Sequence, residues 1–197
     1  MKKATKEQLE FCETHNLTFE QFIGDELIQK SLDLRLLTSV PDGFCPSVRG
    51  SLILSSLTSV PDGFCPRVLF SLHLRSVTSV GEGFCPTVVG GLLLNSLTSF
   101  GEGFCPRVGG SMNMNSLTSV PDGFCQNVRR DLLLKSLTCV GEGFCPNVGG
   151  TLDLSSLISV GEGFCSNVGE TLDLSSLISV GDGFDPFAGK IISNNEF

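Results

Sequence analysis

The chain has 197 residues, 41% of them apolar, and 13 Lys and Arg against 21 Asp and Glu give it a formal net charge of −8. This apolar share argues against a disordered chain, and the length suits one domain with a substantial core. The acidic balance argues against direct nucleic-acid binding, which uses clustered basic side chains to neutralise phosphates. We therefore expect one folded domain that does not contact nucleic acid directly.

Residues 1–30 precede the first repeat and differ from it in composition. Thr5 to His15 has a helical composition, and a second short helix can follow Thr18. The basic start runs into Glu7 and further acidic residues, which argues against a secretory signal peptide. No segment approaches the roughly 18 consecutive apolar residues of a transmembrane helix. The sequence thus predicts a helical N-terminal cap over residues 1–30 of an intracellular protein with no membrane partner.

Residues 31–190 contain eight copies of one twenty-residue unit, S-L-x-L-x-S-L-T-S-V-(P/G)-(D/E)-G-F-C-P-x-V-G-G, without insertion or deletion. A unit this short cannot bury its own apolar side, so it must stack on its neighbours. In the second copy, the alternation over Leu52–Leu54 predicts a short strand. A second extended piece ends at Val60, residues 61–63 have turn chemistry, and Phe64 returns to the core.

Stacking converts each repeated position into a column, with neighbours about 4.8 Å apart if adjacent coils pair as parallel strands. The sequence therefore predicts a mainly β repeat solenoid with a continuous apolar core. One expected core column is Leu32, Leu52, Leu72, Leu92, Met112, Leu132, Leu152 and Leu172, and another is Phe44, Phe64, Phe84, Phe104, Phe124, Phe144, Phe164 and Phe184.

The repeat resembles two kinds of leucine-rich repeat. The run Val77–Phe84 (VTSVGEGF), with Leu92-x-Leu94 opening the next copy, is similar to the V-T-S-I-G-x-x-A-F and I-x-I pattern of BspA-like repeats. The run 57–61 (LTSVP) is similar to the L-T-x-L-P run of short bacterial leucine-rich repeats, whose units have about this length. Leu57 departs from the Asn that many such repeats carry, and Cys follows Phe directly. The resemblance implies leucine-rich-repeat-like coils with a recognition role and no catalytic residues.

The last copy changes character at Asp185. Ile191 and Ile192 begin a ninth strand that Ser193 stops, so we expect a degenerate C-terminal cap over residues 191–197. The predicted organisation is thus a cap over 1–30, an eight-coil solenoid over 31–190 and this second cap.

Seven of the nine Cys residues occupy one repeat position. Neighbouring Cα atoms about 5 Å apart would lie within disulfide range, but side chains in one column point the same way. A straight column also does not converge as four zinc ligands must. We interpret these residues as small buried thiols packed beside Phe and kept reduced in an intracellular compartment, and we expect no cofactor. They are Cys45, Cys65, Cys85, Cys105, Cys125, Cys145 and Cys165.

A second column, which we call the acidic column, lies in the turns. Asp and Glu interchange freely in it, as in solvated turn residues, whereas a calcium site needs several oxygen ligands at fixed geometry. A line of carboxylates could also mimic nucleic acid, as in an inhibitor of a nucleic-acid-binding protein such as a phage-type anti-defence protein. Its members are Asp62, Glu82, Glu102, Asp122 and Glu142, with Asp42, Glu162 and Asp182 at the ends.

The strand positions between and after the inward leucines vary from copy to copy. A copied unit keeps what folding requires and can vary what faces solvent, so these positions are the first candidate for a partner-binding surface, although repeat drift without a ligand also explains them. We call this set the variable strand face: Ile53, His73, Arg75, Leu93, Asn95, Asn113, Asn115, Leu133 and Lys135.

Another variable edge carries basic residues: Arg49, Arg67, Arg107, Arg129 and Arg130, with Phe70. The only histidines, His15 and His73, accompany no nucleophile motif, so we expect no catalytic residues and no enzyme activity. The sequence favours a non-enzymatic protein-binding module with a protein partner. The acidic inhibitor and a structural, self-assembling repeat protein are the alternatives.

Overall fold

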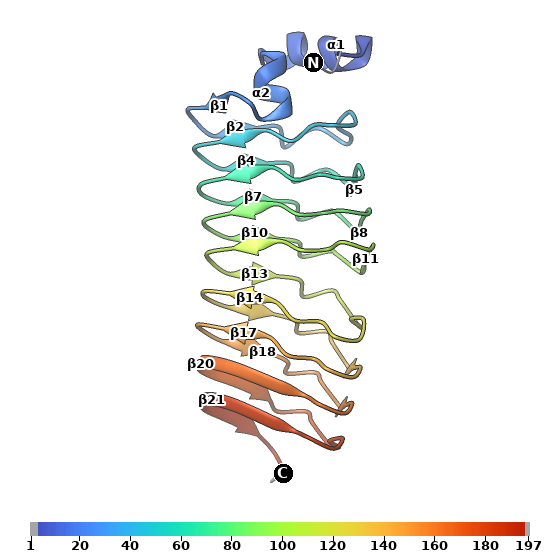
Figure 1. Cartoon of the computed structure of the whole chain (residues 1–197), viewed down its shortest axis with the longest axis vertical. Helices are drawn as coiled ribbons and strands as arrows, with labels where there is room; N and C mark the ends of the chain where they lie inside the picture. The colour runs from blue at the N-terminus through green and yellow to red at the C-terminus, as the bar shows by residue number, and fades with distance from the viewer. Residues whose placement is uncertain (1–3, 196–197) are drawn as a thin grey trace.

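The chain forms a parallel β-solenoid with two short helices at its N-terminal end (Figure 1). The structure is a computed structural model and describes residues 4–195. Leu52 pairs with Leu72, and Leu72 pairs with Leu92, so strand partners in successive coils are twenty residues apart. The predicted stack of twenty-residue coils is confirmed. We number the coils by the repeat copies, from coil 1 (31–50) to coil 8 (171–190).

Two helices, α1 (Lys6–His15) and α2 (Phe19–Ile23), cover the N-terminal end. Each begins with a capping box. The side chain of Thr5 or Thr18 accepts a hydrogen bond from the backbone N–H of Gln8 or Gln21, and the Gln side chain accepts one from the Thr backbone N–H. The Phe22 ring is fully buried and lies 5.3 Å from that of Phe44, centroid to centroid. Helix α2 therefore extends the Phe column by one ring and shields the end of coil 1 from solvent.

The strands fall into three rows that run along the rod. Row A contains β1 (Leu27–Ile28), β3 (Ser47–Val48), β6 (Arg67–Val68), β9 (Thr87–Val88), β12 (Arg107–Val108), β14 (Asn127–Val128) and β17 (Asn147–Val148). Row B contains β2 (Leu32–Asp33), β4 (Leu52–Ile53), β7 (Leu72–His73), β10 (Leu92–Leu93), β13 (Met112–Asn113), β15 (Leu132–Leu133) and β18 (Leu152–Asp153). Row C contains β5 (Ser59–Val60), β8 (Ser79–Val80), β11 (Ser99–Phe100), β16 (Cys139–Val140) and β19 (Ser159–Val160).

Rows A and B merge at the C-terminal end. The long strand β20 (Cys165–Leu174) pairs with β17 of row A and with β18 of row B, and β21 (Asp185–Ser193) pairs along it. The register slips by one residue between Val168 and Thr171. Strand β21 continues past Lys190, where the sequence suggested that the solenoid ends. At the other end, β1 lies before residue 31 and already pairs with β3 of coil 1. The last two residues of the expected C-terminal cap lie outside the described residues.

The turn after row C depends on glycine. Gly63 has φ +68°, a left-handed conformation that is accessible to Gly without steric cost. Its N–H donates to the Glu82 carbonyl oxygen of the next coil at 2.8 Å. Five turns are tied to the next coil in this way, those of Gly63, Gly83, Gly123, Gly143 and Gly163. The acidic side chain beside each of these Gly residues is exposed to solvent.

The interior consists of the expected columns, with one interruption. The Leu side chains of row B that point inward are almost completely buried from coil 2 onward. Neighbouring Phe rings lie 5.3 to 6.5 Å apart on either side of the middle of the rod. Between coils 4 and 5, however, Phe100 lies between Phe104, at 4.2 Å, and Phe124, at 6.1 Å. The expectation of an unbroken Phe column is therefore wrong at this junction.

Candidate functional site

The outward side chains of row B form one straight line. Parallel pairing places Ile53 beside His73, then Leu93, Asn113 and Leu133 in register. Each lies between two buried neighbours and is itself partly exposed, as the twofold alternation of a strand requires. The structure thus brings together the strand residues of the variable strand face, with apolar and polar side chains alternating along the rod.

The second line of the variable strand face lies in the turns that follow row B. Arg75 and Lys135 are exposed, whereas Asn95 and Asn115 are half-buried. The Asn115 side-chain oxygen accepts a hydrogen bond from the Lys135 backbone N–H at 3.3 Å, and the Asn95 side-chain oxygen is buried without a partner. Both Asn side chains are therefore partly withdrawn from the accessible surface, and that of Asn115 also stabilises the turn of the next coil.

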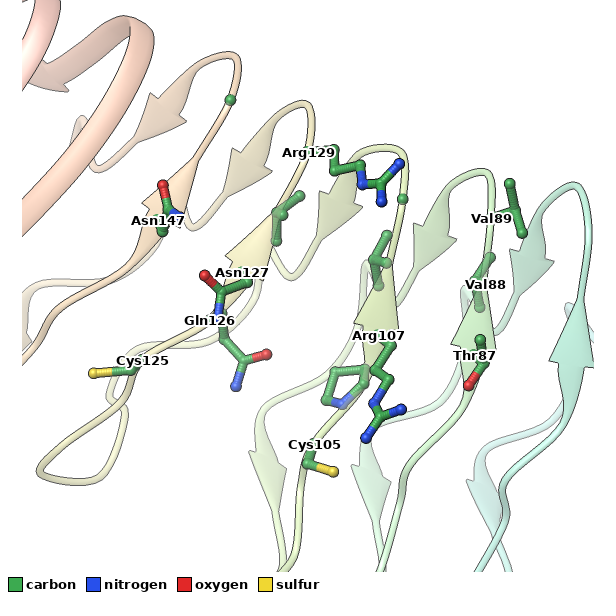
Figure 2. A pocket seen from close by; sticks show the side chains of 15 residues that line it. Thr87, Val88, Val89, Cys105, Arg107, Cys125, Gln126, Asn127, Arg129 and Asn147 are labelled. Carbon is green, nitrogen blue, oxygen red and sulfur yellow. The ribbon is translucent and has the colours of Figure 1, made fainter.

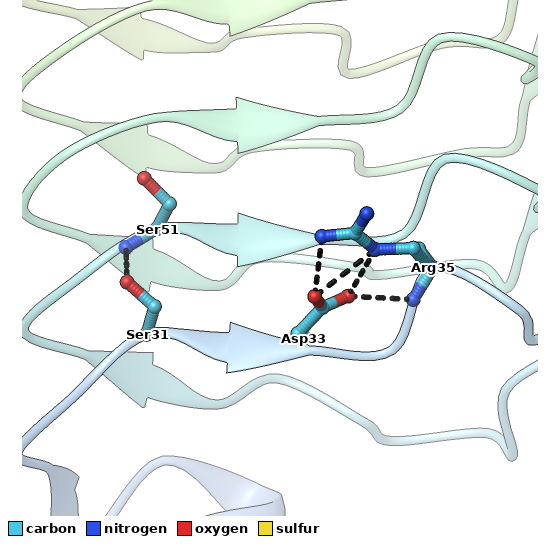
Figure 3. A network of polar contacts seen from close by, with 4 residues as sticks. All are labelled: Ser31, Asp33, Arg35 and Ser51. Carbon is cyan, nitrogen blue, oxygen red and sulfur yellow. Dashed lines mark hydrogen bonds and ion pairs between the residues drawn. The ribbon is translucent and has the colours of Figure 1, made fainter.

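Ion pairs occupy both ends of this face. Figure 3 shows the Asp33 carboxylate accepting from the Arg35 guanidinium and backbone N–H. These hydrogen bonds hold the Asp33 pKa below its ordinary value. At the other end, Lys135 lies 3.7 Å from the Asp153 carboxylate. Between these pairs, the variable strand face offers mainly neutral side chains to a partner.

His73 stands in the middle of this face without a positive charge at neutral pH. Partial burial, and to a smaller extent the Arg75 guanidinium, lowers the His73 pKa below its ordinary value of 6.5. The imidazole is therefore neutral at pH 7 and can both donate and accept a hydrogen bond. Arg75 itself makes no ion pair with any residue between 4 and 195.

The acidic column is exposed along its whole length. Its Asp side chains also stabilise the turns: the Asp62 carboxylate accepts from the Glu82 N–H, and the Asp122 carboxylate accepts from the Glu142 N–H, each at 3.1 Å. No member of the column forms an ion pair within the described part of the chain. The column is therefore a line of solvated carboxylates, some of which also cap the turn of the next coil.

The interpretation of the Cys column as buried, reduced thiols is wrong. Disulfides join Cys85 to Cys105 and Cys145 to Cys165, with Cα atoms 4.8 Å apart in both pairs. At this spacing, stacked coils bring two side chains of one column within bonding range even though they leave the backbone in the same direction. All members of the column are half-buried or exposed. The remaining three form no disulfide: Cys45, Cys65 and Cys125.

Sequence reasoning missed a hollow on row A. It has a volume of about 740 Å³ and spans coils 3 to 6 (Figure 2). Arg107 and Arg129, two members of the basic edge, line it together with Gln126 and Asn127. The signal that could have found it is the clustering of two departures from the repeat, Phe100 and Gln126, with Pro121 around one junction.

Within residues 4–195, no group of three or more His, Cys, Asp or Glu side chains is arranged to hold a metal ion. Nor does this described part contain a helix with the length and apolar character that crossing a membrane requires. Comparisons of the chain with protein-family models, with curated proteins and with solved structures gave no match.

Proposed function

We propose that the protein is a non-enzymatic protein-binding module and that a protein partner docks on the variable strand face. The observation that carries this proposal is the in-register line of partly exposed side chains along row B. The backbone beneath this line is fixed by ladder hydrogen bonds of 2.7 to 3.1 Å, such as Leu92 N–H to Ser111 O at 3.0 Å. A partner would meet a rigid surface, so little conformational entropy is lost on binding.

The chemistry of the face suits a protein surface of mixed polarity. Ile53, Leu93 and Leu133 offer apolar contacts two coils apart, about 10 Å at the usual spacing of parallel strands. His73 and Asn113 lie between them and can exchange hydrogen bonds with backbone or side-chain groups. The resemblance to BspA-like and short bacterial leucine-rich repeats, which implies a recognition role, supports the same proposal.

The test changes Leu93, Asn113 and Leu133 to Ser in one variant. Proteins retained by the immobilised wild-type chain from its native source should be lost by this variant, while the melting temperature changes little because these side chains are only partly buried. A matched control changes two exposed Ile residues and one Asn off this face, Ile158→Ser, Ile178→Ser and Asn167→Ser. Retention of the same proteins by the strand-face variant, or their loss by the control alone, would contradict the proposal.

The acidic column supports a second candidate, an inhibitor that mimics nucleic acid, because its carboxylates are exposed in one line and form no ion pairs with residues 4–195. Changing Glu82 and Glu102 to Gln and Asp122 to Asn would then abolish partner capture while the strand face stays intact. Under our first proposal, this variant retains the partner. A structural, self-assembling role would instead give end-to-end association, which light scattering at working concentration detects.

A further inference from the structure

The backbone ladder of row A opens at one junction, between coils 4 and 5. In other coils the N–H at the first position of the row A strand donates to the previous coil, as Arg107 does to Pro86 O at 2.9 Å and Asn147 does to Gln126 O at 2.9 Å. Asn127 makes no such bond to Pro106 O, and β12 and β14 pair only through Val108 and Val128. Coils 4 and 5 are therefore farther apart here than their neighbours.

The same junction is open at row C and in the turns. Strands β5, β8 and β11 pair with one another, but row C then stops until β16. Gly83 and Gly123 each donate to the next turn at 2.8 Å, whereas Gly103, like Gly43 at the junction of coils 1 and 2, has no equivalent bond to the next coil. A Cβ placed on Gly143 would meet Gly123 at 3.7 Å, but one placed on Gly123 would meet nothing within 4 Å, as is also true of Gly63 in coil 2. Figure 1 shows the wider spacing between the turns of coils 4 and 5.

Two residues explain the opening. Phe100 occupies a position that is Val in most copies, and its ring enters the Phe column and separates Phe104 from Phe124. Pro121 has no N–H and cannot make the bond that Gly101 donates to Val80 O at 3.1 Å. Pro61 lacks the same donor at the junction of coils 1 and 2, where the row A bond from Arg67 to Pro46 O is kept, so Phe100 distinguishes the junction of coils 4 and 5. Row B remains paired through Leu92 with Met112. The two coils thus spread apart on the row A and row C sides while row B holds them together.

The hollow on row A lies over this opening. Figure 2 shows Cys105 on the coil 4 side and Cys125 on the coil 5 side, with the Gln126 side chain directed into the space between. Its lining includes the guanidinium groups of Arg107 and Arg129, neither of which forms an ion pair or a side-chain hydrogen bond within residues 4–195. No carboxylate lines the hollow, although the chain carries a net charge of −8. This is consequently a local positive site on an acidic protein.

We propose that this hollow binds a short, extended acidic peptide segment. Guanidinium groups pair with carboxylates through two parallel hydrogen bonds, and Arg107 and Arg129 are free to do so. The side-chain amides of Gln126 and Asn127 and the Asn127 N–H, which lacks its ladder acceptor, supply further donors. The site lies on row A, whereas the proposed partner surface lies on row B, so it stands independently of that function.

The direct test uses fluorescence anisotropy of a fluorescein-labelled hexaglutamate peptide with the full chain. The variant Arg107→Gln, Arg129→Gln should bind this probe at least tenfold more weakly than wild type. The control Arg49→Gln, Arg67→Gln removes the same charge from the same two repeat positions outside the hollow, and should change the affinity less than twofold. Equal weakening by both variants would mean general charge attraction and would overturn the proposal.

A second variant tests the opening itself. Phe100→Val with Pro121→Gly gives the junction the residues that Val80 and Gly101 supply between coils 3 and 4, so it should restore the ladder and close the hollow with both Arg residues in place. We expect at least a tenfold loss of hexaglutamate binding with an unchanged far-ultraviolet spectrum. Unchanged binding would overturn the proposal. So would displacement of the probe by inorganic phosphate at the concentration at which unlabelled hexaglutamate displaces it, or tighter binding of an oligothymidylate.

Discussion

At the scale of single residues, the repeat separates positions that fold the coil from positions that are free to vary. Leu92 and Leu94 are completely buried, and Leu93 between them is partly exposed. The same holds for His73, whose neighbours Leu72 and Leu74 belong to the core. A change at an outward position therefore alters the surface directly, while the coil beneath it keeps its packing.

His73 should make the stability of the protein depend on pH. Its pKa is lowered in the folded chain, so the unfolded chain binds the proton more readily, and stability falls as the pH drops below the ordinary His pKa of 6.5. We expect His73→Gln to reduce this loss when the free energy of unfolding in urea is compared at pH 7.5 and pH 5. His15 is present in both proteins and does not contribute to the difference. An identical pH dependence of the two proteins would contradict the account.

At the scale of elements, each strand of two residues is too short to be stable alone, so each coil depends on its connections to its neighbours. Most of these connections are backbone hydrogen bonds, and the disulfides of coil 3 with coil 4 and of coil 6 with coil 7 add covalent ones. Phe100 and Pro121 weaken the connection between coils 4 and 5, because these two residues at one junction remove backbone hydrogen bonds from rows A and C.

The disulfides predict a difference between two Cys residues that flank the opening. Cys105 is bonded to Cys85 and Cys125 is free. Because the bond closes a loop with a sequence separation of 20, Cys105→Ser should destabilise the oxidised protein by about 3 kcal/mol. Cys125→Ser should have little effect in the same denaturation assay. The difference should disappear in dithiothreitol, and a difference that persists there would point to packing instead of the covalent bond.

At the scale of the whole molecule, the periodicity of the sequence was sufficient to predict the architecture. A strict twenty-residue period leaves only one register of stacking, so the Leu column of row B follows directly from it. The opening could not be predicted in the same way, because Phe100 in one copy and Pro121 in the next are ordinary variations until stacking places them at the same junction. The pairing of Cys85 with Cys105 likewise depends on side-chain directions that the sequence does not specify.

The basic residues are also distributed unevenly along the rod. Before Lys190, the Lys and Arg residues of the repeats lie between Arg35 and Lys135, and the coils that follow carry an excess of Asp and Glu. The hollow of row A and the neutral centre of the variable strand face both lie in the coils that carry these Lys and Arg residues. A charged partner would therefore be oriented along the rod as well as attracted to it.

The stacking of equivalent residues in register, with an opening of row A between coils 4 and 5, is tested most directly by amide hydrogen exchange measured by nuclear magnetic resonance. The account predicts slow exchange for the row B amides of Leu72, Leu92 and Met112, which donate to the next coil at 2.9, 3.0 and 2.7 Å. It predicts fast exchange at Asn127 and slow exchange at the equivalent Asn147, which retains its bond. Fast exchange throughout row B, or equal protection of Asn127 and Asn147, would contradict it.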